Sequence, residues 1–440
     1  MQVFAVNNDK KGGIEAAGDN MFLALYNILW ATALPFLACS SRLREGWTER
    51  LFAANTNIAR ADIWVQAASA GEAYLATQLI QKCNERGAHR IFITSSTSQG
   101  LTILRNCFAQ IGSSNKRCTL GLGYFPFDMP LIIAKALDAL RPRVFVVLET
   151  ELWPGVFAQC KRRGIPVLII NGRLSKKSLK GHLYLARFWN KYGPSRVMAI
   201  SDQDAKRFST LFPKASVTKM KNMKFDRISF EQREQRTFQF DNETKNNSPL
   251  VILASIRKEE EPDILKAIVG LFRERPEVTI ALFPRHMHRI RQWIKLLKRA
   301  GIEFVLRSEI RSFCHPSKVI LWDVFGELAN MYSLATAAFV GGTLRPCGGQ
   351  NFLEALGAGI VPCIGPYWDN FLWIGREIVE KGLVREVRNV MELVKALSEA
   401  ITQRRPKEEV ISQATSYIKE RQGGTDEAWY EITRWLNRGT

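Results

Sequence analysis

The sequence predicts an α/β protein built from two doubly wound parallel sheets. Short apolar segments alternate with longer helix-like segments, which is the pattern of successive βαβ units. The pattern runs through the first half, stops at the polar stretch 232–248, and then restarts, so we expect a linker between two domains there. The chain has 440 residues and 46% hydrophobic content, which suffices for two sizeable cores.

The first domain, placed at 41–231, alternates strand and helix signals. Its apolar runs are nearly continuous, as expected for strands that are buried on both faces of a parallel sheet. Strands are expected at 63–67, 90–94, 120–124, 144–148, 167–170 and 197–200. Helices are expected at 73–86, 101–111, 130–140, 152–163 and 202–211.

The second domain, placed at 249–420, repeats this alternation. Strands are expected at 250–254, 279–283, 319–321, 337–340 and 361–364, and helices at 262–272, 288–300, 326–333 and 370–381. A last helix within 421–440 carries Trp429 and Trp435, and we expect it to pack back on the first domain. Two such domains leave a cleft, and ligands of doubly wound sheets bind at the carboxyl ends of strands.

Residues 21–40 have the features of a membrane-anchor helix. The segment Met21–Cys39 is uncharged and about as long as a bilayer-spanning helix needs to be. Three arginines follow it: Arg42, Arg44 and Arg50. Such a flank favours a cytoplasmic position for the globular part and disfavours the alternative, a cleaved signal peptide.

The residues before the anchor, 1–20, have the composition of a polar, disordered extension. Translation could therefore start at Met1 or at Met21.

The net charge of +20 calls for an anionic partner. Nucleic acid, phospholipid and phosphorylated substrates all qualify. Aromatic residues are only weakly interleaved with the basic ones, so we expect an anionic membrane surface and no nucleic acid. Two groups of basic residues contribute to this expectation: one directly follows Arg173 in the sequence, and the other surrounds Lys224. The alternative is a solvated basic face that only assists general adhesion.

The cysteines and histidines indicate no metal centre. The eight cysteines show neither a CxxC motif nor metal-ligand spacing, which favours unpaired thiols in a reduced compartment. They are Cys39, Cys83, Cys107, Cys118, Cys160, Cys314, Cys347 and Cys363. The five histidines are scattered.

A glycine-rich stretch in the second domain, residues 336–371, is the strongest ligand-binding signal. Gly341 and Gly342 follow an apolar strand, and glycines there let the backbone approach an anion and point amide groups at it. A helix starting near Asn351 would add its dipole, and Glu354 could bind the two hydroxyls of a ribose. The alternative is an ordinary tight turn between strand and helix.

Acidic residues follow two strands of the first domain. Ser69, Gly71 and Glu72 come after the first strand, where a carboxylate could remove a proton from an acceptor hydroxyl. Glu72 could instead complement a helix dipole. Glu149 and Glu151 follow the fourth strand and could bind sugar hydroxyls or orient a cation. They could equally start a helix whose first turn contains a proline.

Basic residues follow strands of the second domain. Pro284, Arg285 and His286 come after its second strand, and an arginine there can pair with phosphate in a forked geometry. Ser255 and the basic residues after it follow the first strand and add another loop that faces anions.

Taken in order, these motifs resemble the bacterial 3-deoxy-D-manno-octulosonic acid (Kdo) transferases, the membrane-anchored enzymes of lipopolysaccharide assembly. The resemblance covers residues 21–425. It is carried by WVQAASAGE (64–72), TSSTSQG (94–100), YFPFDMP (124–130), RPRVFVVLETELWP (141–154), NGRLS (171–175), PRH (284–286), GELANMYSLATAAFVGGTL (326–344) and GGQNFLEALGAG (348–359).

The resemblance implies a GT-B fold, CMP-Kdo as the donor, the glucosamine disaccharide of a lipid A precursor as the acceptor, inversion at the transferred sugar, and no bound metal or other cofactor. It also implies an enzyme on the cytoplasmic face of the inner membrane. Glu72 would be the general base, whereas Ser69, Gly71, Glu151 and Arg173 would belong to the acceptor and sugar site. The donor site would comprise Ser255, Pro284, Arg285, His286, Gly341, Gly342, Asn351 and Glu354.

The chain departs from the family pattern mainly around the expected donor site. Gln350 and Phe352 stand where histidine and proline are common, and residues 255–258 lack the usual histidine. Gly155 and Gly172 replace residues more often seen as Asn and Ala. These departures leave open a related transferase that uses another nucleotide sugar. A noncatalytic lipid-binding scaffold is the remaining alternative.

Overall fold

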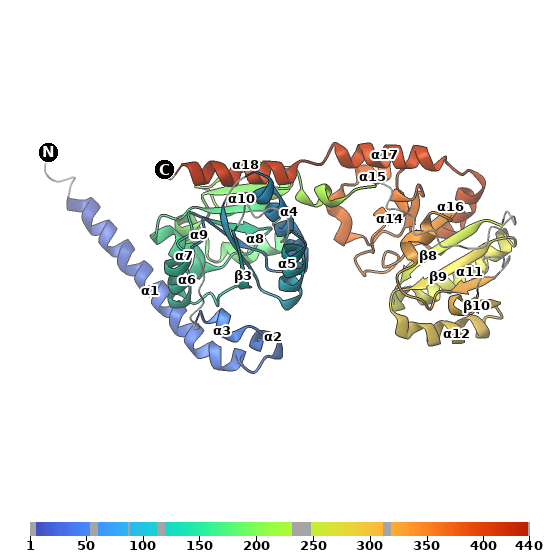
Figure 1. Ribbon diagram of the computed structural model, residues 1–440, viewed down its shortest axis with the longest axis horizontal. Coiled ribbons are helices and arrows are strands. Elements are labelled where there is room, and N and C mark those ends of the chain that lie inside the picture. Colours follow the sequence, from blue (N-terminus) through green and yellow to red (C-terminus); the bar gives the residue numbers. More distant parts are fainter. Residues whose placement is uncertain are drawn as a thin grey trace. The chain divides into compact units, whose positions relative to one another are not determined.

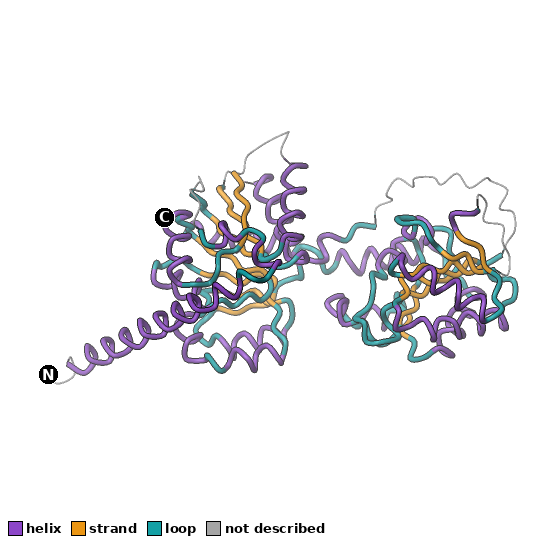
Figure 2. Tube along the Cα trace, turned by 90° about the horizontal axis from the view of Figure 1, so that it is seen from below, coloured by secondary structure: helices purple, strands orange, loops and turns teal. Residues whose placement is uncertain are grey.

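The computed structural model describes residues 6–52, 60–86, 89–111, 119–230, 248–310 and 318–438. It divides into two compact units (Figures 1 and 2). Unit 1 comprises Met1–Asp226 and Gln422–Thr440, and unit 2 comprises Arg227–Arg421. The expected linker lies outside the described residues except for Ser248.

Unit 1 contains a seven-stranded parallel sheet of order β3-β2-β1-β4-β5-β6-β7. Its strands are β1 (Ile63–Gln66), β2 (Arg90–Ser95), β3 (Thr119–Tyr124), β4 (Val144–Leu148), β5 (Val167–Gly172), β6 (Arg196–Ala199) and β7 (Ser216–Lys219). Strand β1 pairs with both β2 and β4, so the chain reverses its winding direction there. Such a switch point is where a doubly wound sheet binds its ligands.

Helices cover both faces of this sheet (Figure 1). One face carries α4 (Ala70–Arg86), α5 (Ser98–Ile111) and α18 (Gly424–Asn437). The other carries α6 (Pro130–Leu140), α7 (Pro154–Arg162), α9 (Ala186–Tyr192) and α10 (Asp202–Leu211). Helix α8 (Lys176–Leu183) and the 3₁₀ helix η1 (Met223–Arg227) complete the unit.

The C-terminal helix α18 belongs to unit 1, where we expected it to pack. Trp429 is buried with residues of α4 and the sheet. Arg196 of β6 forms an ion pair with Glu431 at 3.1 Å, and Arg143 donates to the Leu436 carbonyl at 2.5 Å. The last residues of the chain therefore help to build the first domain.

The N-terminal region differs from the prediction. Helix α1 (Val6–Leu37) begins well before residue 21, so residues 6–20 are helical rather than a disordered extension. The apolar residues of α1 pack in part on unit 1: Leu23 is buried against Ala158 and Tyr192. Within the part of the chain that the structure describes, we find no helix with the length and apolar character required to cross a bilayer.

Two short helices follow, α2 (Ser41–Arg44) and α3 (Trp47–Arg50). Arg50, which we counted among the basic residues flanking an anchor, is buried. Its guanidinium lies 4.3 Å from the centre of the Tyr124 ring and donates to the Ser96 carbonyl at 3.0 Å. Arg50 therefore serves the packing of unit 1.

Unit 2 contains a second seven-stranded parallel sheet, of order β10-β11-β9-β8-β12-β13-β14. Its strands are β8 (Leu250–Ile256), β9 (Thr279–Pro284), β10 (Phe304–Leu306), β11 (Val319–Leu321), β12 (Ala337–Val340), β13 (Pro362–Ile364) and β14 (Arg385–Glu386). Strand β8 lies at the centre between β9 and β12, so it marks the switch point of this sheet.

Helices of unit 2 pack against its sheet (Figure 1). One face carries α11 (Glu261–Glu274), α12 (Ile290–Arg299) and α16 (Val390–Thr402). The remaining helices are α13 (Leu328–Tyr332), α14 (Leu353–Gly357), α15 (Glu377–Glu380) and α17 (Lys407–Lys419), with the 3₁₀ helices η2 (Lys258–Glu260), η3 (Met287–Arg289), η4 (Arg307–Glu309) and η5 (Asp369–Ile374). The helix expected at 370–381 is interrupted at Gly375, whose φ of 98° a helix cannot contain.

Candidate active site

Glu72 lies at the centre of the candidate site in unit 1, in the first turn of α4 after β1. Its carboxylate is almost fully buried, with 9% of the residue exposed. One oxygen accepts from the Ala68 amide at 2.6 Å, and the other accepts from the Ser69 hydroxyl at 3.1 Å. These two bonds fix the orientation of the carboxylate. Ser69 therefore contributes to the candidate site by orienting Glu72. Gly71 is exposed beside it.

The surroundings of Glu72 raise its pKa from 4.5 to about 7. Burial is the main cause, and the negative charges of Glu151 and Glu149 add to it. The bonds from Ala68 and Ser69 oppose the rise. A carboxyl group with this pKa can take up and release protons near neutral pH, which suits a general base.

The loop after β4 brings two more carboxylates to this site. Glu149 has a φ of 57°, in the left-handed region, and its side chain forms an ion pair with Lys224 at 2.6 Å. Glu151 accepts from the indole nitrogen of Trp153 at 2.6 Å, and burial raises its pKa. Glu72 and Glu151 are thus brought together, as the sequence predicts.

The loop after β5 joins the loop after β4. The hydroxyl of Thr150 donates to the carbonyl of Arg173, whose side chain is exposed. Strands β1, β4 and β5 are neighbours in the sheet, so Glu72, Glu151 and Arg173 follow three adjacent strands. The acceptor-site residues expected from the sequence therefore gather at one edge of the sheet.

Lys224, which the sequence marks only as one of several basic residues, joins the candidate site through its ion pair with Glu149. It lies on η1, and Met223 in the same segment is held from two sides: its amide donates to the Asn171 side chain at 2.9 Å, and its carbonyl accepts from Gln78 of α4 at 3.1 Å. Asp226 accepts from the amides of Gly423 and Thr425, both at 2.6 Å. These bonds hold η1, and hence Lys224, against the helix that carries Glu72.

Asp128 supports the start of α7, directly after the Glu149–Trp153 loop. This buried carboxylate accepts from the amides of Gly155 and Val156 at 2.6 and 2.7 Å, and from the Tyr26 hydroxyl of α1 at 3.0 Å. Burial raises the pKa of Asp128 to about 7. A Cβ atom at residue 155 would lie 2.2 Å from the Asp128 carbonyl oxygen, which explains the glycine at this position.

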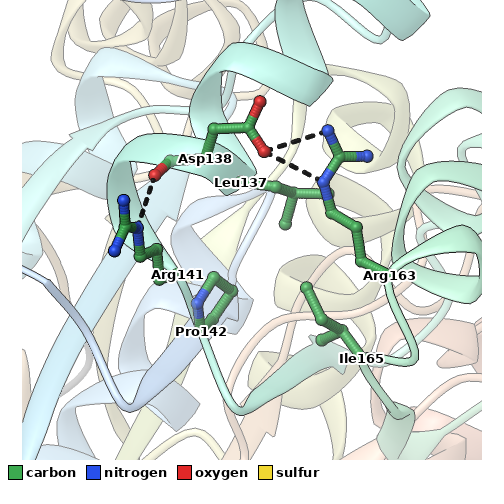
Figure 3. A pocket seen from close by; sticks show the side chains of 6 residues that line it. All are labelled: Leu137, Asp138, Arg141, Pro142, Arg163 and Ile165. Carbon is green, nitrogen blue, oxygen red and sulfur yellow. Dashed lines mark hydrogen bonds and ion pairs between the residues drawn. The ribbon is translucent and has the colours of Figure 1, made fainter.

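Two pockets of unit 1 lie at the opposite edge of the sheet. The first, of about 380 Å³, is lined by residues that precede β4 and β5; Figure 3 shows Arg163 paired there with Asp138 at 3.0 Å. The second, of about 250 Å³, includes Trp189 and three lysines. Neither contains a residue that we assigned to the site, because those residues follow the strands rather than precede them.

In unit 2, the expected donor residues follow three adjacent strands, β9, β8 and β12. Ser255 has a φ of 54°, at an irregularity in the pairing of β8 with β9. The amide of Arg285 donates to the Ile256 carbonyl at 2.8 Å, which joins the loops after β8 and β9 and leaves the Arg285 side chain exposed. Pro284 is buried at the end of β9.

Basic side chains that follow β8 and β9 lie near one another. The rings of His286 and His288 stack with their centres 5.4 Å apart. Desolvation, followed by the positive charges of Arg257, His288 and Arg285, lowers the pKa of His286. These positive charges disfavour a proton on His286, and a bound phosphate or carboxylate would offset them.

The expectation that the glycine-rich loop offers free amides to a phosphate is wrong. The amides of Gly341 and Gly342 do not stand free for a phosphate: Gly341 donates to the Ala254 carbonyl at 2.8 Å, and Gly342 donates to the carboxylate of Glu260 at 2.5 Å. The amides of Thr343 and Leu344 also donate to Glu260, both at 2.8 Å. The anion that this loop binds is therefore a buried side chain of the same unit.

The expectation that a helix dipole after this loop helps to bind phosphate is also wrong. Helix α14 begins at Leu353 and is only five residues long, so its dipole adds little. The side chains of Asn351 and Glu354 are exposed and bonded to each other at 2.9 Å. Phe352 is fully buried, with its ring 5.3 Å from that of Phe371, so it does not project toward a ligand.

Among the described residues there is no group of three or more His, Cys, Asp or Glu side chains that could hold a metal ion. The six described cysteines are free thiols. Cys118 and Cys314 lie outside the described residues.

Comparisons with solved structures identify the fold. The crystal structure of a glycosyltransferase from Rickettsia africae ESF-5 aligns over 86% of this chain and 99% of that chain, with a TM-score of 0.56 and 9% identity. A UDP-N-acetylglucosamine 2-epimerase structure aligns over 86% and 95%, with a TM-score of 0.51 and 13% identity. At these identities the likeness concerns the fold alone. Two parallel α/β sheets of this kind define a GT-B-like glycosyltransferase fold.

Comparisons of sequence identify the family. The family model described as 3-deoxy-D-manno-octulosonic-acid transferase (kdotransferase) matches residues 45–227. The 3-deoxy-D-manno-octulosonic acid transferase of Haemophilus influenzae is 30% identical over 415 residues, which cover 90% of this chain and 94% of that one. The Bordetella pertussis protein of the same name is 30% identical over 328 residues, covering 73% and 75%. The chain therefore belongs to the Kdo transferase family, as its motifs indicated, and is a glycosyltransferase.

Proposed function

We propose that this protein transfers Kdo from CMP-Kdo to the glucosamine disaccharide of a lipid A precursor in lipopolysaccharide synthesis, with inversion at the transferred sugar. Family membership supports the donor and the class of acceptor. The observation that carries the chemistry is Glu72: a buried, doubly hydrogen-bonded carboxyl group whose pKa is raised to about 7.

In this mechanism Glu72 takes the proton from the attacking hydroxyl of the acceptor. The hydroxyl oxygen forms a bond to the anomeric carbon of Kdo while the bond from that carbon to the phosphate oxygen of CMP breaks. The proton ends on Glu72 and the electron pair on the leaving CMP. Because one displacement inverts the centre, a single base is sufficient.

Negative charge develops on the departing phosphate, and cationic side chains of unit 2 can stabilise it. Arg285 has an exposed guanidinium, and the charges of Arg257 and His288 act on the neighbouring His286. Asn351 and Glu354 offer an amide and a carboxylate to the ribose. We assign no metal to the reaction because these side chains can supply the positive charge.

We further propose that the protein works at the cytoplasmic face of the inner membrane. Helix α1 exposes apolar side chains toward solvent: Met21, Leu25, Ile28, Leu29 and Phe36. Together with the net charge of +20, they suit contact with an anionic lipid surface. Flotation with vesicles that contain or lack anionic lipid tests this location, and equal recovery with both would contradict the role of charge.

The direct test of function is incubation of the full chain with CMP-Kdo and a tetra-acylated lipid A precursor, followed by mass spectrometry. We expect the acceptor to gain the mass of one or more Kdo residues, with undiminished turnover in EDTA. No product with CMP-Kdo, but product with a UDP-sugar, would refute the proposed donor. Loss of turnover in EDTA would refute the metal-independent mechanism.

A further inference from the structure

Glu260 is the most deeply buried carboxylate associated with the glycine-rich loop, with 0% of the residue exposed. It ends the 3₁₀ helix η2, directly before α11. Its two oxygens accept from three successive amides of the loop after β12, those of Gly342, Thr343 and Leu344, at 2.5 to 2.8 Å. They also accept from the Arg257 amide at 3.3 Å.

The same carboxylate therefore connects the loops that follow β8 and β12. Gly341 completes this connection: a Cβ atom there would lie 2.8 Å from the Ser255 carbonyl oxygen and 3.0 Å from a carboxylate oxygen of Glu260. Only glycine lets the two loops approach so closely. A second pair reinforces the contact, because Arg345 bonds to Asp263 of α11 at 2.7 Å.

The loop in turn supports the rest of the expected donor site. The Gly342 carbonyl accepts from the Gly349 amide at 2.7 Å, and the Gly341 carbonyl accepts from the Gln350 amide at 3.2 Å. Thr343 accepts at its hydroxyl from the Gly365 amide at 2.8 Å. Residues 348–351 are thus hydrogen-bonded to the segment that Glu260 holds. Asn351 is the last of these residues, and Glu354 follows shortly after it.

These contacts leave no free amide at residues 341–344 for a phosphate, since all four donate to groups of unit 2. Charge-assisted bonds of this kind are roughly twice as strong as neutral ones, and a carboxylate buried without them would be costly. A ligand phosphate would have to displace Glu260 to use the loop. The exposed cations near β8 and β9 are the groups that remain for it.

We propose that Glu260 is a positioning residue for the nucleotide-sugar donor. It fixes the loop after β12 to the Arg257 segment, so that side chains, rather than loop amides, bind the donor phosphate. The inference rests on the proposed function, because it takes a cytidylate donor to be the ligand of unit 2. Glu260 itself does not touch the donor.

The test compares Glu260→Gln with Glu261→Gln in the full chain. Glu261 is the adjacent residue, equally charged and 5% exposed, but it bonds to Arg289 rather than to the loop, at 2.6 and 2.8 Å. It is therefore a matched control for the loss of a buried carboxylate. The probe is CMP, titrated by calorimetry, with KM for donor and acceptor measured separately.

We expect Glu260→Gln to raise the Kd for CMP and the KM for the donor by about tenfold, since the binding-competent loop becomes a minor population. The KM for the acceptor should stay unchanged, and Glu261→Gln should alter donor binding less than about twofold. Hydrogen exchange at residues 341–345 should speed up only in Glu260→Gln. Equal donor affinities in the two variants would overturn the proposal.

If Glu260→Gln does not fold, Asp263→Asn provides the test, because its partner Arg345 is more than half exposed and the loss of such a pair costs about 1 kcal/mol or less. A rise of about two- to threefold in the Kd for CMP supports the proposal, and an unchanged Kd overturns it. CMP binding by the wild type distinguishes an error in the proposed function from an error in the positioning role. If it fails to bind CMP, the proposed function is wrong, whereas wild-type binding matched by Glu260→Gln contradicts the positioning role alone.

Discussion

Replacing Glu72 by Gln should make the protein more stable at alkaline pH while removing its activity. The pKa of Glu72 is raised to about 7 in the folded protein against an ordinary value of 4.5. Between these values the folded state holds more protons than the unfolded state, so the stability of the wild type falls as pH rises from about 4.5 to 7. Glutamine does not ionise, so the variant does not lose stability through this group as the pH rises.

The size of the effect follows from the same pKa. A rise from 4.5 to about 7 corresponds to about 3 kcal/mol of unfavourable free energy for the ionised carboxylate. This is an upper limit, because Gln also weakens the bonds that the carboxylate accepts from Ala68 and Ser69. We expect Glu72→Gln to raise the free energy of unfolding by about 1–3 kcal/mol at about pH 8, and by much less at about pH 5.

Urea unfolding followed by tryptophan fluorescence at several pH values measures this difference. Asp128 also has a raised pKa, but it is present in both proteins and cancels in the comparison. Glu85→Gln is a suitable control, because Glu85 lies on the same helix with its side chain 58% exposed. A stability difference that does not grow with pH would refute the reasoning about the environment of Glu72.

Three further predictions concern the surroundings of the site. Glu151→Gln removes the carboxylate whose charge raises the pKa of Glu72 more than that of Glu149 does, so the acid limb of the kcat/KM profile should move to lower pH. Lys224→Met leaves the charge of Glu149 unpaired and should move the acid limb to higher pH. Each shift should be about one pH unit or less, and shifts in the same direction would contradict this. Gly155→Ala should destabilise the protein by about 1–3 kcal/mol in thermal unfolding, whereas Gly181→Ala, with nothing within 4 Å of its added Cβ, should not. Tyr26→Phe should cost about 1–2 kcal/mol by removing the hydroxyl bonded to Asp128, and the same change at Tyr184, which is 91% exposed, should cost nothing measurable; equal effects would exclude a role for the bond.

The central strands could be predicted from the sequence because burial on both faces makes them continuous apolar runs. Strands β1, β4 and β5 have every residue buried and were expected within one or two residues of their observed bounds. Strand β7 was missed because it lies at a sheet edge, where its residues remain largely exposed. Strand β14 has only two residues and carries no pattern at all.

Candidate site residues could be predicted where they directly follow a strand in the sequence, and not where they depend on pairing in the folded structure. Glu72 and Glu151 were singled out because each follows a buried strand. Glu260 was missed because its partners lie 82 to 84 residues away, and a carboxylate in a run of three glutamates has no signature of burial. The pairing of Lys224 with Glu149 depends likewise on tertiary structure, which one sequence does not show.

The most direct test of the account is a single-turnover assay of Kdo transfer from CMP-Kdo by the wild type and by Glu72→Gln at saturating donor. We predict that the wild type forms product, and that Glu72→Gln binds CMP with the same affinity but forms product at least about a hundredfold more slowly. Wild-type rates in Glu72→Gln would contradict the assignment of Glu72 as the base, and with it the proposed mechanism.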